Sequence, residues 1–326
     1  MARQDNKALP KSSAKTLSKL TLLDRLTSID RSEECRKRIL NMENNFRRKI
    51  DAHIASRLQN NAKFKTFKTN PYVLLIHAKQ RGYSKVSDLE SDLLPAKQFS
   101  SMETSVGKMV EEVVLPVYGW ECVASKMHTK NSTLDGKNLD GDTLRLVTLK
   151  SGPSCLNDSI SKQMADDILN NYQEWANDAG VSKIDFSYGV LYGTQKTSNK
   201  KDWHILKNID KKRPDIMTVT PEHRWNCQFV DNNITVNVTV RVGLDWWEHL
   251  GGELCFMEIF SALIRACIIP GEMDATDYEY TLSDINSIVS TASIPKDYNV
   301  SILQRSQIPW LFLMAKHFCD RIIDAP

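Results

Sequence analysis

The chain has 326 residues, of which 41% are hydrophobic, and it carries a formal net charge of +3. This composition is ordinary for a globular protein and allows one large domain or two modest ones. The sequence contains no apolar run long enough to cross a membrane, and its first residues lack the apolar core of a secretory signal. We therefore predict an intracellular protein.

Charge is distributed unevenly along the chain. Residues 1–70 contain 17 Lys and Arg against 7 Asp and Glu, whereas the remaining residues contain 26 against 33. A basic segment beside an acidic body indicates a polyanionic partner such as nucleic acid, although a solvated charged helix would give the same pattern. The seven cysteines include no C-x-x-C pair, so we expect free thiols and no zinc site.

The amino-terminal third reads as a tail followed by helices. Residues 1–15 are polar and are predicted to form a disordered basic tail. Apolar residues then recur at helical spacing over residues 17–58, with a break near Ser28 to Ser32 that indicates two helices. Asn70-Pro71 marks a further helix start and Gly82 its end. We predict a helical amino-terminal region over residues 16–99.

A second region is predicted over residues 100–326. Ser100-Ser101 caps a helix that ends at Pro116, and three strands follow, the last two joined at Gly141. A helix over 156–176 and a strand over 184–193 come next. Later elements are expected as strands at 203–208, 216–219 and 234–242, and as helices at 244–269, 282–292 and 300–323. This order predicts an α/β (α+β) fold with a mixed central sheet flanked by helices.

Two polar residues stand on neighbouring strands of the predicted hairpin. Asp135 lies roughly across from Thr148, so Asp135, Thr148 and Lys150 can converge on one face, while Leu149 points the other way. Phosphodiester hydrolysis needs carboxylates that hold a divalent cation and a positive charge near the attacking oxygen. Such residues are more often ordinary solvated turn residues, so the pattern alone leaves both interpretations open.

The surrounding sequence resembles a known family. The run LVTLKSGPSCLND after TLDG, between the helix ETSVGKMVEE and a long helix, resembles the type II restriction endonucleases of the PD-(D/E)xK superfamily, and is most similar to the subgroup that cuts GGNCC-type palindromes. SYGVLYGTQKTSNKKDWHILKNID looks like the family's next strand pair, and VGLDWWEHLGGE like its tryptophan-containing helix start. The resemblance covers residues 70–266.

This resemblance implies a PD-(D/E)xK core with helical additions at both ends, the nuclease domain being residues 100–326. It also implies Mg²⁺-dependent hydrolysis of double-stranded DNA at a short palindrome, leaving 5′-phosphates, by a homodimer in the bacterial cytoplasm. The sequence has no phosphate-binding or dinucleotide-binding glycine motif, so we expect no nucleotide cofactor. The alternatives are a nonspecific or repair nuclease of the same superfamily, or a non-catalytic DNA-binding module.

The resemblance also assigns roles at the catalytic centre. Asp135 is implied to be a metal ligand, Lys150 the motif lysine, and the Leu149 carbonyl a further ligand. Thr148 occupies the position where most of the superfamily has Glu or Asp, so a second carboxylate must come from elsewhere. Glu111, in the G-x-x-x-E arrangement of the preceding helix, is the first choice. The remaining alternatives are Glu112, Asp166 and Asp167.

Polar residues after the catalytic strand and in two cationic loops are predicted to contact DNA. They are Asn157, Lys162, Gln195, Lys196, Asn199, Lys200, Lys201 and Arg213. An ordinary polar hairpin would explain the loop around Lys196 equally well. Trp246 and Trp247 are expected to serve as core or dimer contacts.

Overall fold

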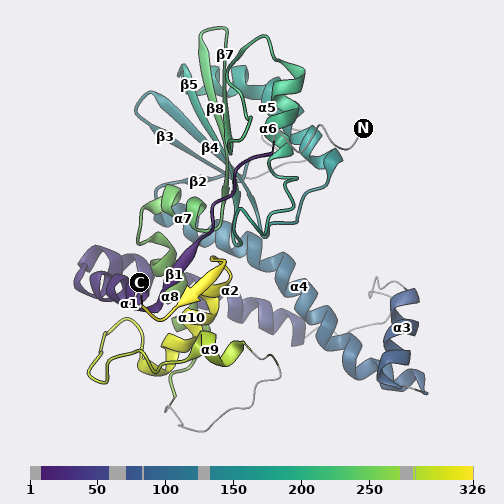
Figure 1. The fold of residues 1–326 in the computed structure, drawn as a ribbon, viewed down its shortest axis with the longest axis vertical. Coiled ribbons are helices and arrows are strands. Elements are labelled where there is room, and N and C mark those ends of the chain that lie inside the picture. Colours follow the sequence, from purple (N-terminus) through teal and green to yellow (C-terminus); the bar gives the residue numbers. More distant parts are fainter. Residues whose placement is uncertain are drawn as a thin grey trace.

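A mixed β-sheet forms the centre of one lobe of the protein (Figure 1). The structure is a computed structural model that describes residues 9–58, 71–82, 84–123, 133–271, 282 and 284–325. Within these residues the sheet has seven strands in the order β2-β3-β4-β5-β8-β7-β6. They are β2 (Glu121–Cys122), β3 (Gly136–Asp140), β4 (Thr143–Lys150), β5 (Lys183–Val190), β6 (Met217–Val219), β7 (Asn226–Asp231) and β8 (Ile234–Val242).

The three central strands are parallel and the outer strands are antiparallel to their neighbours. Two helices, α5 (Asp158–Ala179) and α6 (His204–Lys212), lie on one face of the sheet (Figure 1). The side chain of Asn157 caps α5 by accepting a hydrogen bond from the amide of Ile160 at 2.9 Å. The helix ends at Gly180, whose φ of 67° is a conformation that glycine adopts readily. The predicted mixed sheet flanked by helices is confirmed.

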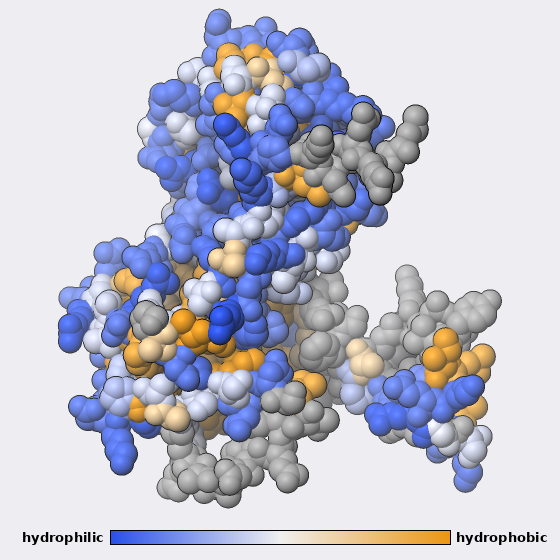
Figure 2. All heavy atoms as spheres, viewed as in Figure 1, coloured by the Kyte–Doolittle hydropathy of each residue, from blue (hydrophilic) through white to orange (hydrophobic). Residues whose placement is uncertain are grey.

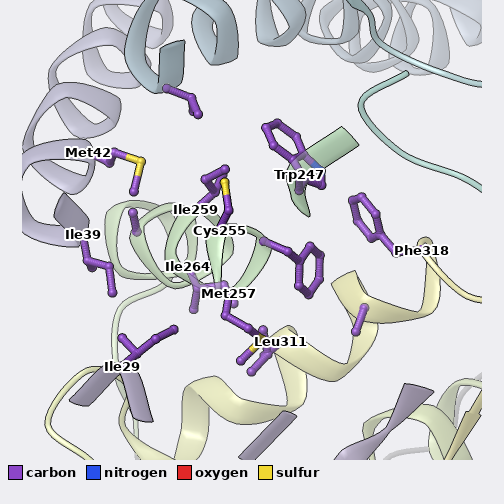
Figure 3. Packing of buried hydrophobic residues seen from close by; sticks show 14 of the residues in the cluster. Ile29, Ile39, Met42, Trp247, Cys255, Met257, Ile259, Ile264, Leu311 and Phe318 are labelled. Carbon is purple, nitrogen blue, oxygen red and sulfur yellow. The ribbon is translucent and has the colours of Figure 1, made fainter. Parts of the chain in front are cut away.

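A helical lobe lies at one end of the sheet. It contains α1 (Lys19–Arg31), α2 (Glu33–Leu58), α7 (Leu244–Gly251), α8 (Cys255–Cys267), α9 (Ile285–Val289), the 3₁₀ turn η3 (Arg305–Gln307) and α10 (Ile308–Lys316). Figure 3 shows apolar side chains of these helices meeting around Ile29, Ile39, Ile259 and Leu311, which are all fully or almost fully buried. Trp246 and Trp247 are buried in the same core, which is the first of the two roles predicted for them.

A long helix, α4 (Val86–Val117), runs from the sheet to a protruding arm that ends in α3 (Pro71–Arg81) (Figure 1). The prediction that a helix begins at Ser100 is wrong, because α4 begins at Val86 and passes through Ser100 without interruption. Serine favours a helix start but is tolerated inside a helix whose other residues favour it. The predicted boundary between residues 99 and 100 therefore falls inside a helix.

Other element predictions also differ from the structure. Residues 204–212 form α6, because Ile205, Leu206 and Ile209 are buried at helical spacing, so the strand predicted at 203–208 is wrong. Strand β7 was not predicted, although the Asn232-Asn233 turn that joins it to β8 has the positive φ values, 50° and 61°, of a tight hairpin. The helix predicted over 244–269 is divided at Gly252, where φ is 83°.

Both ends of the described chain also differ from the predicted pattern. Residues 16–18 form β1 (Thr16–Ser18), which pairs in parallel with β9 (Arg321–Ile323). Helices were predicted from residue 17 onward and over 300–323, so both strands differ from the prediction. Residues 9–15, assigned by composition to a disordered tail, run along the sheet lobe before β1 (Figure 1). We name residues 9–18 the amino-terminal strap. The rest of the predicted tail lies outside the described residues.

None of the described helices is long and apolar enough to span a lipid bilayer.

A buried ion pair joins the basic amino-terminal helices to the rest of the molecule. Arg38 on α2 donates through Nε and Nη2 to the two carboxylate oxygens of Glu258 on α8, each at 2.7 Å, and the Tyr118 hydroxyl donates to Glu258 at 2.7 Å. The Glu258 side chain is 1% exposed. Part of the amino-terminal positive charge is therefore neutralised inside the protein.

Replacing Arg38 with alanine is expected to lower the free energy of unfolding by about 3 to 5 kcal/mol, because it leaves the Glu258 carboxylate buried without a counter-charge. The matched control is Lys37→Ala, which removes an exposed ion pair with Glu33 and is expected to cost at most about 0.5 kcal/mol. Urea denaturation measures both values. Equal losses in the two variants would contradict the role assigned to the buried pair.

Candidate active site

The ends of β3 and β4 bring the first two predicted catalytic residues together. Asp135 directly precedes β3, and its amide donates to the Val147 carbonyl at 2.8 Å. Because Gly136 pairs with Val147, Asp135 lies opposite Thr148, as the hairpin prediction requires. The Asp135 carboxylate accepts a hydrogen bond from the Leu149 amide at 2.6 Å. This bond fixes the orientation of the carboxylate beside Lys150, the last residue of β4.

Glu111, the first choice for the helix-borne carboxylate, lies on α4, which lies against the end of β4. A Cβ atom at Gly107 would be 3.9 Å from Cβ of Ser151, the residue after Lys150, and Glu111 follows Gly107 by about one helical turn. Burial, then the negative charge of Asp135, raises the pKa of Glu111 to about 7, and the positive charge of Lys150 opposes this rise. Glu111 therefore lies within range of the charges of both Asp135 and Lys150.

Two of the three alternative carboxylates form ion pairs with lysines other than Lys150. Glu112 forms ion pairs with Lys49 and, at 3.7 Å, with Lys108, and the contact with Lys49 lowers its pKa. Asp166 on α5 pairs with Lys212 on α6. The pKa of Asp167 is raised by burial. Of the four candidates, Glu111 is the carboxylate whose pKa responds to the charges of Asp135 and Lys150.

Thr148 does not replace the missing acid. Its side chain is buried, and its hydroxyl donates to the backbone carbonyl of Thr133. The backbone of Leu149 is placed differently: its amide points toward Asp135, and in an extended strand the carbonyl of a residue points to the same side as its amide. Leu149 also lies beyond Val147, the last β4 residue that pairs with β3. Its carbonyl is thus directed at the Asp135 side of the hairpin.

This set of oxygen atoms could hold a divalent cation. Two carboxylates and one carbonyl are hard oxygen ligands, and Mg²⁺ commonly uses one or two carboxylates and keeps several waters. Within the described ranges no group of three or more His, Cys, Asp or Glu side chains is arranged to hold a metal. Burial also raises the pKa of Asp135, so both carboxylates lie where a bound cation would stabilise their charged forms.

The predicted DNA contacts around α5 have different surroundings. Asn157 is exposed, but its side-chain oxygen caps α5. Lys162 is exposed on α5. Lys201 donates to Asp158 at 2.6 Å, and Arg213 pairs with Asp215 at 3.0 Å and with Asp231 at 3.6 Å. Lys162 thus presents its charge to solvent, whereas Lys201 and Arg213 are paired with carboxylates.

The remaining four predicted contacts lie in residues 193–201, which we call the 193–201 loop and which lie between β5 and α6. Lys196 and Asn199 are exposed. Gln195 donates its side-chain amide to Asp245 at 3.3 Å. Lys200 turns inward with a φ of 67°, and its ammonium lies 5.1 Å from the centre of the Trp225 ring. The loop thus presents Lys196 and Asn199 to solvent and uses Lys200 for an internal contact.

Two buried polar residues near Asp135 and Thr148 were not predicted to belong to the site. Tyr188 on β5 pairs in register with Thr148, and the charge of Asp135 contributes to its raised pKa, which is due first to burial. Asp202 is fully buried next to Tyr188, and burial raises its pKa to about 6. The alternation of side chains along β5 places Tyr188 on the same face as Thr148, so its position near the site could have been predicted from the sequence. The position of Asp202 could not, because its burial depends on how the 193–201 loop folds.

The mixed seven-stranded sheet flanked by helices is consistent with a restriction-endonuclease fold. Residues 40–223 match the family model described as Type II restriction endonuclease EcoO109I, and this segment is more than half of the chain. The chain belongs to this family. It is therefore a type II restriction enzyme, a site-specific nuclease whose substrate is DNA. A search of curated proteins found no match.

Proposed function

We propose that this restriction enzyme hydrolyses double-stranded DNA at a short palindrome with a GGNCC-type core, using Mg²⁺ in a PD-(D/E)xK-type site and leaving 5′-phosphates. The observation that supports the proposal is that the charges of Asp135 and Lys150 act on the buried Glu111 carboxyl of α4. In this proposal Glu111 supplies the second carboxylate that Thr148 does not provide. The matched family segment contains all of these residues.

Each residue has a distinct task in this proposal. Asp135, oriented by the Leu149 amide, and Glu111 would hold the cation together with the Leu149 carbonyl. When bound, Mg²⁺ polarises the scissile phosphate and acidifies a water molecule. The Lys150 ammonium orients the attacking water and stabilises the negative charge that develops on the phosphate oxygens. Thr148 maintains the hairpin geometry through its bond to Thr133.

Digestion of a plasmid with Mg²⁺, compared with the same reaction in EDTA, tests this proposal. Discrete fragments that appear only with Mg²⁺ are the expected result, and sequencing the fragment ends gives the recognition site and the cut position. A continuous smear would favour a nonspecific or repair nuclease. Intact plasmid with a gel shift would favour a DNA-binding module without catalysis.

The Mg²⁺ requirement should depend on pH. Metal binds the charged carboxylate, and the pKa of Glu111 is about 7. Below that pH, protons compete with the metal for Glu111, so the Mg²⁺ concentration for half-maximal cleavage should rise by about tenfold per pH unit. Cleavage rates measured over a Mg²⁺ series at several pH values check this. A half-maximal concentration that stays constant through the same range would contradict the role of Glu111.

We also propose that the enzyme acts as a homodimer. Two-fold symmetry lets each subunit cut one strand of a palindrome. The protruding arm supports this proposal, because His77 and Arg81 on α3 bind Asp92 on α4, at 2.9 Å and 3.3 Å, while Leu75 and Ile76 are 73% and 68% exposed. Figure 2 shows the resulting apolar surface on the arm. Leu75 and Ile76 are thus exposed apolar side chains on a helix that is attached to α4 through Asp92.

Introducing charge at this surface is expected to prevent dimer formation. The double substitution Leu75→Glu and Ile76→Glu should convert a dimer into a monomer, because two carboxylates would be buried in an apolar contact. The control is Gln80→Glu, at an exposed position of the same helix. Light scattering after size-exclusion chromatography gives the mass of each variant. A double variant that remains dimeric would place the contact elsewhere.

A further inference from the structure

The amino-terminal strap holds the 193–201 loop through Ser12. The Ser12 hydroxyl donates to the backbone carbonyl of Gln195 at 3.2 Å and accepts from the Lys200 ammonium at 3.0 Å. Lys200 also donates directly to the Gln195 carbonyl. Ser12 thus connects Gln195 and Lys200, which are five residues apart in the loop.

Two carboxylates outside the loop form further bridges between it and the strap. Asp320 accepts from the Lys15 amide at 2.7 Å and from the Thr194 hydroxyl at 3.1 Å. Asp245 accepts from the Lys15 ammonium at 2.9 Å and from the Gln195 side chain at 3.3 Å. Each carboxylate therefore binds the strap with one oxygen and the loop with the other. Lys15 takes part in both bridges, once through its backbone and once through its side chain.

The strap is itself fixed to the sheet lobe at its beginning. Trp225 donates its indole N–H to the Lys11 carbonyl at 2.9 Å, and the Lys11 amide donates to the His223 carbonyl at 3.2 Å. The same Trp225 ring lies under the Lys200 ammonium. The other end of the strap is β1, which pairs with β9. The strap is therefore anchored on both sides of its contacts with the loop.

The loop also lies next to the catalytic strand. The Asn199 amide donates to the Pro153 carbonyl at 3.4 Å, and Pro153 follows Lys150 by three residues. A Cβ atom at Gly193 would be 2.9 Å from the Pro153 ring, so there is no spare room between the loop and this turn. The loop therefore lies directly against the turn that follows the catalytic strand.

We propose that the strap is a positioning device for DNA recognition: Ser12, Lys15 and Asp320 fix the 193–201 loop so that Lys196 and Asn199 are held ready to contact DNA. A loop that is ordered before binding loses less conformational entropy when the DNA arrives. The strap and Asp320 lie outside the segment that matches the family model, whereas the loop lies inside it. This inference rests on the proposed function, because it assumes that the loop contacts DNA.

Amide hydrogen exchange of Ser12→Ala without DNA tests the structural half of the inference. Exchange in residues 194–201 is expected to be about threefold to tenfold faster than in the wild-type protein, the effect of losing about one hydrogen bond. Ser12→Thr keeps the hydroxyl and should restore slow exchange. Ser13→Ala, at an exposed neighbouring position, should leave exchange unchanged. Asp320→Asn retains one acceptor oxygen for two donors and should act in the same direction as Ser12→Ala.

DNA affinity and cleavage test the recognition half. Ser12→Ala should weaken binding to a short duplex with a GGNCC centre by about threefold to tenfold, seen as a higher KM with kcat within about twofold of the wild-type value. Unchanged hydrogen exchange in Ser12→Ala, or an equal rise in exchange in Ser13→Ala, would overturn the role assigned to the strap. Faster exchange with wild-type affinity would overturn its link to DNA. If the wild-type protein binds no DNA, the proposed function fails and the link to DNA fails with it, while the exchange data still test the strap.

Discussion

Replacing Lys150 with alanine is expected to lower the cleavage rate by about 10² to 10⁴ while leaving DNA affinity close to that of the wild-type enzyme. Lys150 ends β4 beside Asp135, and its positive charge acts on both Asp135 and Glu111. Its contribution is greatest where negative charge develops on the phosphate, so the loss should appear in catalysis and not in binding. Single-turnover cleavage and gel-shift titration measure the two effects separately.

The matched control is Lys183→Ala. Lys183 begins β5, is exposed, and pairs with Asp142 at the opposite end of the sheet from Lys150. Its loss should leave the cleavage rate near the wild-type value. Cleavage by Lys150→Ala at the wild-type rate would remove Lys150 from the site, and an equal fall in both variants would point to a general loss of folded protein.

Replacing Glu111 with glutamine is expected to reduce Mg²⁺-dependent cleavage by at least about 10², because the amide removes one of the two charged ligands of the proposed cation. Glutamine keeps the shape of the side chain, and the neutral form is favoured by burial, so folding should be maintained. The cleavage rate as a function of Mg²⁺ concentration distinguishes weaker metal binding from slower chemistry.

Glu112→Gln provides a control at the adjacent position of the same helix. Glu112 is directed at Lys49 and Lys108, so its loss should change cleavage by no more than a few-fold. The reverse result, with Glu112→Gln inactive and Glu111→Gln active, would show that the other face of α4 supplies the ligand.

The sequence was most informative where local rules decide the structure. The pairing of Asp135 with Thr148 follows from the Asp140-Gly141-Asp142 turn and the two-residue period of a strand, and the structure has this register. Glu111 could be proposed because Thr148 left the site one carboxylate short. Its approach to Asp135 depends on the path of α4, which the sequence did not define, since the helix begins well before Ser100.

The sequence was less informative where distant segments decide the structure. The polar composition of residues 9–15 suggested a disordered tail, but their backbone groups bind His223 and Trp225, more than two hundred residues away. Lys200 looked like a DNA contact because its neighbours are polar, yet Ser12 and Trp225 bind its ammonium inside the protein. Such contacts arise from the tertiary fold, which residue spacing along the chain does not report.

The predicted DNA contacts differ in whether their side chains are already engaged in ion pairs. Lys162, Lys196 and Asn199 are exposed and can reach a ligand without breaking an ion pair. Lys201 and Arg213 would first have to leave Asp158 and Asp215. The energetic cost of breaking an exposed ion pair is small, about 0 to 1 kcal/mol, so both residues remain compatible with phosphate binding.

The position of Mn²⁺ in crystals of the enzyme, located by its anomalous scattering, tests the proposed site most directly. Mn²⁺ binds the same oxygen ligands as Mg²⁺. We expect a peak bounded by the carboxylates of Asp135 and Glu111 and by the Leu149 carbonyl. A peak beside Asp166 or Asp167, or none near Asp135, would contradict it.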